Sequence, residues 1–89
     1  MCEAEVEIIN KLGLHARAAL KFVELSLKHS SQVTVAREGR EVNGKSILGL
    51  MTLAARSGTI LSIETVGEDE KELLDALRTL VANKFGESV

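Results

Sequence analysis

The period of the apolar residues changes from two to about 3.6 residues across a short turn near the start of the chain. Residues 3–9 alternate between glutamates and apolar side chains, which is typical of a strand with one solvated face. Beyond the turn at residues 10–13, apolar residues recur at helical spacing, at Ala16, Ala19, Leu20, Val23 and Leu27. His15 therefore stands where a strand has ended and a helix is about to begin.

The sequence predicts three more strands. Val33 and Val35 alternate with polar neighbours, and Arg40–Val42 are expected to pair back with them after a tight turn. Residues 59–66 carry apolar side chains on both faces in their first half. A strand of that kind is covered on both sides, so we expect it to lie centrally in the sheet.

Two more helices are predicted. Ser46 is expected to cap a short, very apolar helix that residues 56–58 end. The last helix has acidic residues 68–70 in its first turn and is expected to continue to Phe85, with Gly86 closing it. We therefore predict an α+β fold in which three helices cover one face of a mainly antiparallel sheet. The other face, with the glutamates of the first strand, is expected to be solvated.

Composition limits the classes of function. The chain has 89 residues, 45% of them apolar, which fits one domain spanning residues 1–89. A net charge of −2 and only two aromatic residues argue against nucleic-acid binding. No apolar run reaches the ~18 residues of a membrane span, and the acidic start does not resemble a signal peptide. We expect a cytoplasmic, unprocessed monomer without a cofactor.

A metal site is not expected. Cys2 is the only cysteine, so neither an internal disulfide nor a cluster of thiolate ligands can form. His15 and His29 lie at opposite ends of one predicted helix, roughly 20 Å apart by helical rise, so they cannot share a metal ion. No Cys–His or Ser–His–Asp set is apparent in the sequence either.

His15 takes the place of the Ser, Thr, Asp or Asn that usually caps a helix. An imidazole nitrogen is a nucleophile near neutral pH, and the first N–H groups of a helix attract anions. A phosphoryl group on His15 could be met by the N–H groups of Ala16 and Arg17 and by the Arg17 guanidinium. Gly13 permits a tight turn beside the imidazole. The alternative is that His15 is a surface residue with no chemistry.

Two segments resemble the signatures of a known family. Residues 10–17, NKLGLHAR, resemble the active-site segment of the HPr family, the histidine-containing phosphocarriers of the phosphoenolpyruvate-dependent phosphotransferase system. Residues 42–51, VNGKSILGLM, resemble that family's second signature, around a regulatory serine. The resemblance covers essentially the whole chain. It implies an open-faced β-sandwich with strand order 1-4-2-3. One departure is Ala18, where many members have proline.

The resemblance also implies roles for individual residues. His15 would accept a phosphoryl group on Nδ1 from phospho-Enzyme I, with help from Arg17, and pass it to an Enzyme IIA-type partner. Ser46 would be the site of an HPr kinase/phosphorylase, and its phosphate would repel an acidic partner. A patch near His15 would dock successive partners. Its members would be Leu14, Phe22, Ile47, Leu48 and Met51.

Three alternatives remain open at this point. The carrier could belong to the nitrogen-related branch of the phosphotransferase system instead of the sugar branch. The chain could be a regulatory binding module that is controlled through Ser46 while His15 is idle. It could also be an unrelated α+β domain that binds a small ligand or RNA, which would need a basic or aromatic surface that the sequence does not provide.

Overall fold

The computed structural model describes residues 1–89. The strands are β1 (Cys2–Glu7), β2 (Gln32–Arg37), β3 (Arg40–Asn43) and β4 (Ile60–Val66). The helices are α1 (Ala16–Leu27), α2 (Ile47–Met51) and α3 (Glu70–Ala82), and α3 is followed by the short 3₁₀ helix η1 (Lys84–Gly86). All strands pair antiparallel in the order β1-β4-β2-β3. The predicted topology is therefore confirmed, including the interior position of β4.

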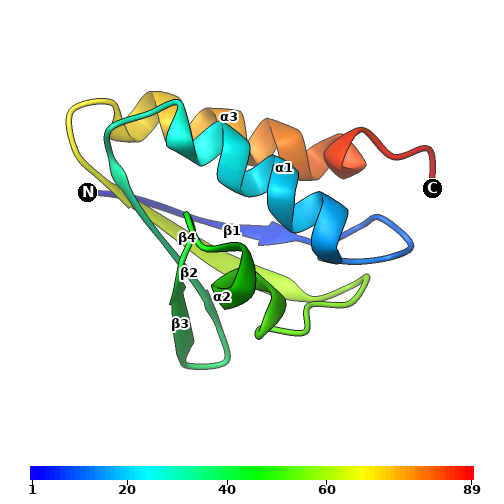
Figure 1. Ribbon diagram of the computed structural model, residues 1–89. Helices are drawn as coiled ribbons and strands as arrows, with labels where there is room; N and C mark the ends of the chain where they lie inside the picture. Colours follow the sequence, from blue (N-terminus) through cyan, green and yellow to red (C-terminus); the bar gives the residue numbers. More distant parts are fainter.

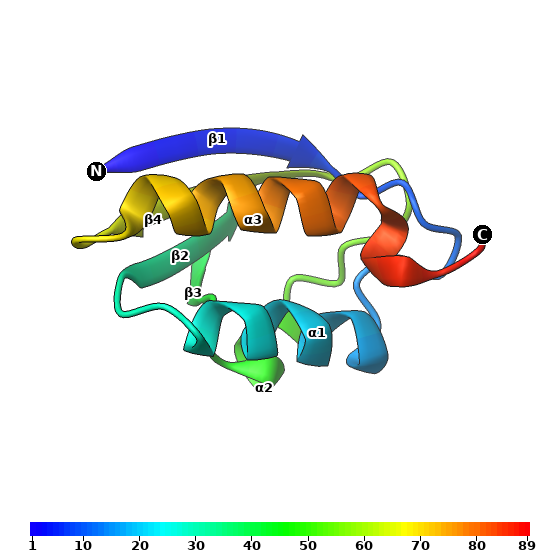
Figure 2. The ribbon, with the colours of Figure 1, turned by 90° about the horizontal axis from the view of Figure 1, so that it is seen from above.

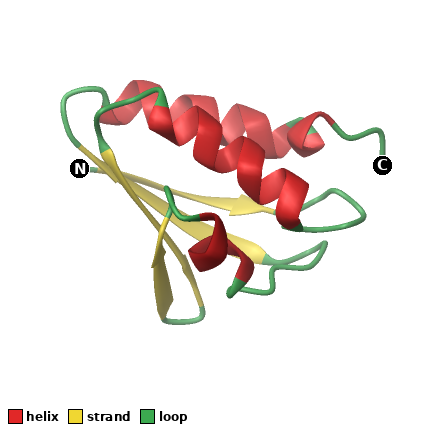
Figure 3. Ribbon diagram, viewed as in Figure 1, coloured by secondary structure: helices red, strands yellow, loops and turns green.

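The helices cover one face of the sheet, as Figures 1 and 3 show. Seen from above in Figure 2, α1 and α3 run side by side over the strands, and α2 lies next to α1. Between the two layers lies a core of 18 buried residues, in which every side chain except Phe22 and Phe85 is aliphatic. The glutamates of β1 are exposed on the opposite face, as predicted. None of the helices is long and apolar enough to span a membrane.

The buried face of α1 differs from the predicted one. Ala18 and Phe22 point into the core together with Ala19 and Val23, whereas Leu20 is 43% exposed. Two overlapping apolar stripes can be drawn on this helix, and the sequence pattern does not separate them. The structure selects the stripe that carries the phenylalanine, because its larger side chain buries more apolar area.

The predicted end of α3 is wrong. The helix ends at Ala82, and Lys84 and Phe85 take positive φ angles of 57° and 56°. Gly86 therefore does not cap α3; it is the last residue of η1 and has a φ of 81°. Phe85 still reaches the core, where it is 1% exposed. This irregular segment carries residues 87–89 back toward the turn that precedes α1. The letter C marks this end of the chain in Figures 1 and 2.

Candidate functional site

His15 is the N-cap of α1, as the sequence predicts. Its backbone is extended, with φ −79° and ψ 179°, and Ala16 is the first helical residue. The backbone N–H of Arg17 donates to Nδ1 of His15 over 3.3 Å. The side chain thus caps the helix through Nδ1 and is held against the end of α1 where helical N–H groups are free.

The other ring nitrogen contacts a residue that the sequence did not single out. Nε2 of His15 pairs with the Oε2 atom of Glu87, and the two residues are 72 positions apart in the sequence. A carboxylate only accepts hydrogen bonds at neutral pH, so Nε2 must be the donor. Nδ1 accepts from Arg17, so the two contacts require the same tautomer, with the proton on Nε2 and a lone pair on Nδ1.

Glu87 is itself held in place by Asn10. The side-chain amide of Asn10 donates over 2.9 Å to Oε1 of Glu87 and over 2.8 Å to the carbonyl oxygen of Gly13. Asn10 is completely buried. Its hydrogen bond to Glu87 is the main cause of a lowered pKa for that carboxyl group, and the contact with His15 adds to it. Glu87 is therefore ionised at neutral pH and faces the imidazole as an anion.

Gly13 allows the turn that presents His15. It has φ of +68°, and a Cβ atom there would lie 2.5 Å from the carbonyl oxygen of Ala55. That same oxygen accepts the backbone N–H of Leu14 over 2.8 Å. The segment from Ala55 to Arg56 therefore packs directly against the turn and fixes the position of the backbone just before His15.

Three cationic residues, Lys11, Arg17 and Arg56, lie near His15. A shallow depression beside the imidazole is lined by Lys11, Arg56 and Ser57 among other residues. Arg17 is exposed, and its guanidinium forms no ion pair. The sequence predicted Arg17 as an anion-binding residue and did not single out Lys11, which stands in the same segment, or Arg56, which comes from a loop 41 residues away. Positive side chains beside His15 favour the approach of an anionic group.

Two of the predicted docking residues do not lie on the surface. Leu14 is 7% exposed and Phe22 is 2% exposed, because both fill the core beneath the start of α1. Ile47 is partly buried, whereas Leu48 and Met51 are 77% and 42% exposed. The sequence pattern marked these residues as apolar but could not tell which of them face inward.

Ser46 caps α2, as predicted. Its backbone is extended, and its Oγ atom accepts the backbone N–H of Gly49 over 3.0 Å. The helix is shorter than expected, since it ends at Met51 and residues 53–55 continue as an irregular loop. Leu48 and Met51 are thus the exposed apolar residues of a single-turn helix that follows Ser46.

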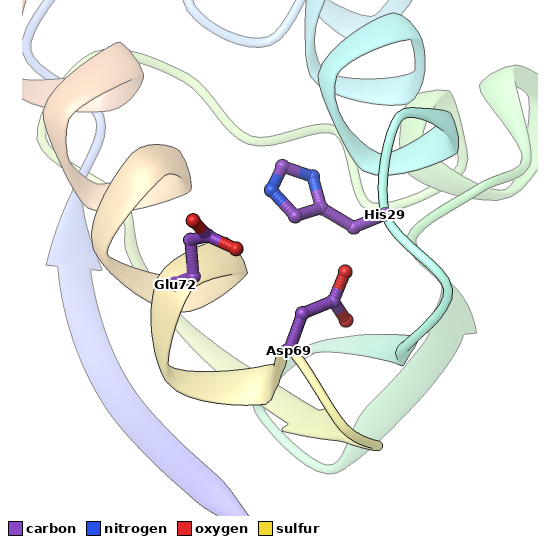
Figure 4. Close-up of side chains that lie close together, drawn as sticks. All are labelled: His29, Asp69 and Glu72. Atoms are coloured by element: carbon purple, nitrogen blue, oxygen red, sulfur yellow. The ribbon is translucent and has the colours of Figure 1, made fainter.

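The other histidine belongs to a separate cluster. His29, Asp69 and Glu72 bring their potential ligand atoms within 4.8 Å of one another, and Figure 4 shows their side chains converging. Both oxygens of Asp69 already accept hydrogen bonds from Ser30 and Ser31. The carboxylate therefore serves to hold the turn after α1 against the start of α3.

Comparisons with known proteins identify the family. A family model described as "PTS HPr component phosphorylation site" matches residues 2–83. The chain is 52% identical over 87 residues to the phosphocarrier protein HPr of Cupriavidus necator, with 98% of each chain covered. It is 51% identical over 87 residues to the phosphocarrier protein HPr of Neisseria meningitidis serogroup A, again with 98% of each covered.

A solved structure is similar over the same extent. The crystal structure of HPr-C-His from Thermoanaerobacter tengcongensis superposes with a TM-score of 0.96 at 44% identity, and 100% of both chains is covered. The family's proteins are phosphocarriers of the phosphotransferase system, and they are not enzymes in themselves. These matches agree with the strand order β1-β4-β2-β3 and with a histidine at the N-cap of α1. The chain belongs to the HPr family of phosphocarrier proteins.

Proposed function

We propose that Nδ1 of His15 accepts a phosphoryl group from phospho-Enzyme I, charged from phosphoenolpyruvate, and passes it to Enzyme IIA-type proteins in sugar uptake. The observation that carries this proposal is the orientation of the imidazole. Nδ1 has its lone pair toward the free N–H groups at the start of α1, while Nε2 is engaged by Glu87. Only Nδ1 is therefore both nucleophilic and next to an anion-binding helix end.

The transfer exchanges one bond for another. A bond forms from Nδ1 of His15 to phosphorus as the bond from phosphorus to the donor breaks. The backbone N–H of Arg17 then turns from Nδ1 to a phosphoryl oxygen, and the N–H of Ala16 and the Arg17 guanidinium supply further donors. The same groups release the phosphoryl group when an acceptor nucleophile attacks phosphorus from the opposite side. The chain turns over no small molecule.

The partners would dock on the exposed apolar residues of α2. Leu48 and Met51 lie on the helix that packs next to α1, and Ile47 is half-buried against the core. Replacement of Leu48 by Glu should raise the KM for transfer to and from partners by about tenfold, because a charge would be buried in the complex. Leu27→Glu is the matched control, since Leu27 is 63% exposed but lies at the far end of α1. Equal effects of the two substitutions would contradict docking on α2.

Ser46 is proposed as a regulatory phosphorylation site for an HPr kinase/phosphorylase. A phosphate there would add negative charge directly before Ile47 and Leu48, in the proposed docking surface, and would repel an acidic partner. Ser46→Asp should slow acceptance at His15 without lowering the melting temperature, because aspartate also caps helices. Thr79→Asp, which adds the same charge on an exposed position of α3, should leave acceptance unchanged. A wild-type rate in Ser46→Asp would rule out this regulation.

The experiment that tests the carrier function uses Enzyme I and phosphoenolpyruvate. The chain should gain the mass of one phosphoryl group, which acid removes and alkali does not, as expected of phosphohistidine. His15→Ala should gain none, and His29→Ala should gain as much as the wild type. A phosphoryl group on the His15→Ala variant would contradict the proposal.

The same experiment separates the alternatives. No gain of mass with an active cognate Enzyme I would favour a regulatory module that is controlled through Ser46, with His15 idle. Transfer from the nitrogen-related Enzyme I in preference to the sugar-related one would assign the chain to the nitrogen branch. We propose the sugar branch, and a cytoplasmic monomer consisting of one domain, residues 1–89. The signature around Ser46 supports this choice, since it resembles that of carriers with a serine kinase.

A further inference from the structure

The last six residues of the chain fold back onto the site and do not form a loose tail. Phe85 is buried in the core, and its carbonyl oxygen accepts a hydrogen bond of 2.6 Å from Nζ of Lys21 on α1. Further along, the carbonyl oxygen of Val89 accepts the backbone N–H of Lys11 over 3.0 Å. Residues 84–89 are thus anchored on both sides of Glu87, which fixes the backbone from which its side chain reaches His15.

The contacts of Glu87 account for both oxygens of its carboxylate. One oxygen accepts from Asn10 and the other from Nε2 of His15. The side chains of Glu87 and His15 are 14% and 27% exposed, so water competes weakly for this pair. Both amide protons of Asn10 are used, and its Oδ1 atom is buried without a partner. That orientation leaves an acceptor unsatisfied, which indicates that donation to the carboxylate decides how Asn10 lies.

We infer that Glu87 is a positioning residue for phosphoryl transfer: it holds the proton of His15 on Nε2, aims Nδ1 at the incoming phosphorus, and stabilises the cation that forms. This inference rests on the proposed carrier function. When Nδ1 bonds to phosphorus, the proton stays on Nε2 and the ring gains a positive charge next to the Glu87 carboxylate. A carboxylate that orients a histidine through its second nitrogen is a recurring arrangement in histidine chemistry. Here it comes from the far end of the chain.

The test compares four proteins: the wild type, Glu87→Ala, Glu87→Gln and Glu24→Gln. Glutamine keeps an oxygen that can accept from Nε2 but removes the charge. Glu24 is exposed on α1, and its replacement makes the same change in net charge away from His15. Two quantities are measured for each: the ¹⁵N chemical shifts of the neutral His15 ring, and the rate of phosphoryl acceptance from phospho-Enzyme I.

The expected results differ between the variants. Glu87→Ala should increase the fraction of the tautomer with the proton on Nδ1, and it should slow acceptance by about tenfold or more. Glu87→Gln should preserve most of the tautomer and lose only part of the rate. Glu24→Gln should match the wild type in both measurements. A change of tautomer in the ring shifts is a signature that a purely structural effect of the substitution would not produce. If Glu87→Ala does not fold, the ring shifts and the acceptance rate of Glu87→Gln test the inference.

Other outcomes would overturn the inference. Wild-type ring shifts in Glu87→Ala would show that the carboxylate does not set the tautomer. Shifted ring signals with a wild-type rate would show that the tautomer does not matter for transfer. In both cases the carrier function would stand, because the variant would still be phosphorylated on His15. Failure of the wild type itself to accept a phosphoryl group would remove the carrier function and this inference together.

Discussion

At the scale of single residues, the presentation of His15 depends on Gly13. The positive φ of Gly13 is unfavourable for any residue with a Cβ atom, and the backbone of Ala55 leaves no room for one. The constraint is tied to the site because Leu14, the next residue, hydrogen-bonds to the same carbonyl oxygen of Ala55. A side chain at position 13 would therefore move the residues directly before His15.

We predict that Gly13→Ala lowers the free energy of unfolding by roughly 2–4 kcal/mol, from left-handed strain plus the clash with Ala55. The rate of phosphoryl acceptance should fall as well. Gly39→Ala is the matched control, because Gly39 has a φ of +85° but nothing within 4 Å of an added Cβ. That variant should lose only about 1 kcal/mol and keep the wild-type rate. Urea unfolding curves that are equal for the two variants would show that contact with Ala55 is unimportant.

The residue scale also explains what the sequence could not reveal about the site. His15 and Arg17 stand in one short segment, so their local roles were predictable from helix-capping chemistry. Glu87 and Arg56 are brought to His15 only by the tertiary fold, and neither lies in a local pattern that marks it. Leu14 and Phe22 were predicted as docking residues, but both are buried. A sequence pattern does not tell whether an apolar side chain next to a site packs into the core or lies on the surface.

At the scale of elements, Asp69 joins α3 to the end of α1. Its carboxylate accepts hydrogen bonds from the backbone N–H groups of Ser30 and Ser31 and from the Ser31 hydroxyl. These bonds, with that of the Ser31 hydroxyl foremost, lower the pKa of Asp69 from 3.8 to about 2. Although Asp69 is the N-cap of α3, its side chain makes no capping bond within that helix. It instead ties two elements together.

This pKa shift predicts a pH dependence of stability. The folded state binds the proton of Asp69 less tightly than the unfolded state, so the ionised carboxylate stabilises the fold above about pH 4, and this contribution is lost as the pH falls from about 4 to about 2. Asp69→Asn should therefore melt below the wild type at pH 6, and the gap should close over that range. Asp75→Asn, an exposed position on the same helix, should differ little from the wild type throughout. A gap for Asp69→Asn that is constant between pH 6 and pH 2 would contradict this account.

The elements also divide into those that the sequence predicts well and those that it does not. β1, β4 and the start of α1 were predictable because strand alternation and helical spacing are distinct periods. The end of α3 was not, because the apolar spacing continues to Phe85 while the backbone has already left the helix. Phe85 occupies the core from a left-handed turn, which no periodicity argument anticipates. The end of α2 at Met51 was missed for a similar reason, since Leu53 remains buried beyond the helix.

At the scale of the whole molecule, the core is small and lacks tryptophan and tyrosine. Phe22 and Phe85 are its two largest side chains, and Phe85 also anchors the segment that carries Glu87. A domain of this size has a narrow margin of stability, on the order of 5–10 kcal/mol. Loss of either ring would therefore use up a large part of that margin.

We predict that Phe85→Ala lowers the free energy of unfolding by about 3–5 kcal/mol, and that Phe85→Leu costs clearly less because it refills part of the cavity. Both variants should also accept a phosphoryl group more slowly, since the position of Glu87 depends on this anchor. Val89→Ala serves as the control, because the Val89 side chain is 56% exposed and its backbone contact with Lys11 would remain. Chemical denaturation measures the stabilities. A Phe85→Ala variant as stable as the wild type would mean that the segment is not part of the core.

The central claim is that the chain carries a phosphoryl group on Nδ1 of His15. The most direct measurement is ³¹P and ¹⁵N NMR of the ring-labelled protein after treatment with Enzyme I and phosphoenolpyruvate. We expect a single phosphorus signal that is coupled to Nδ1 of His15, with the proton retained on Nε2 beside Glu87. A phosphorus signal coupled to Nε2 of His15, or to any nitrogen of His29, would contradict it.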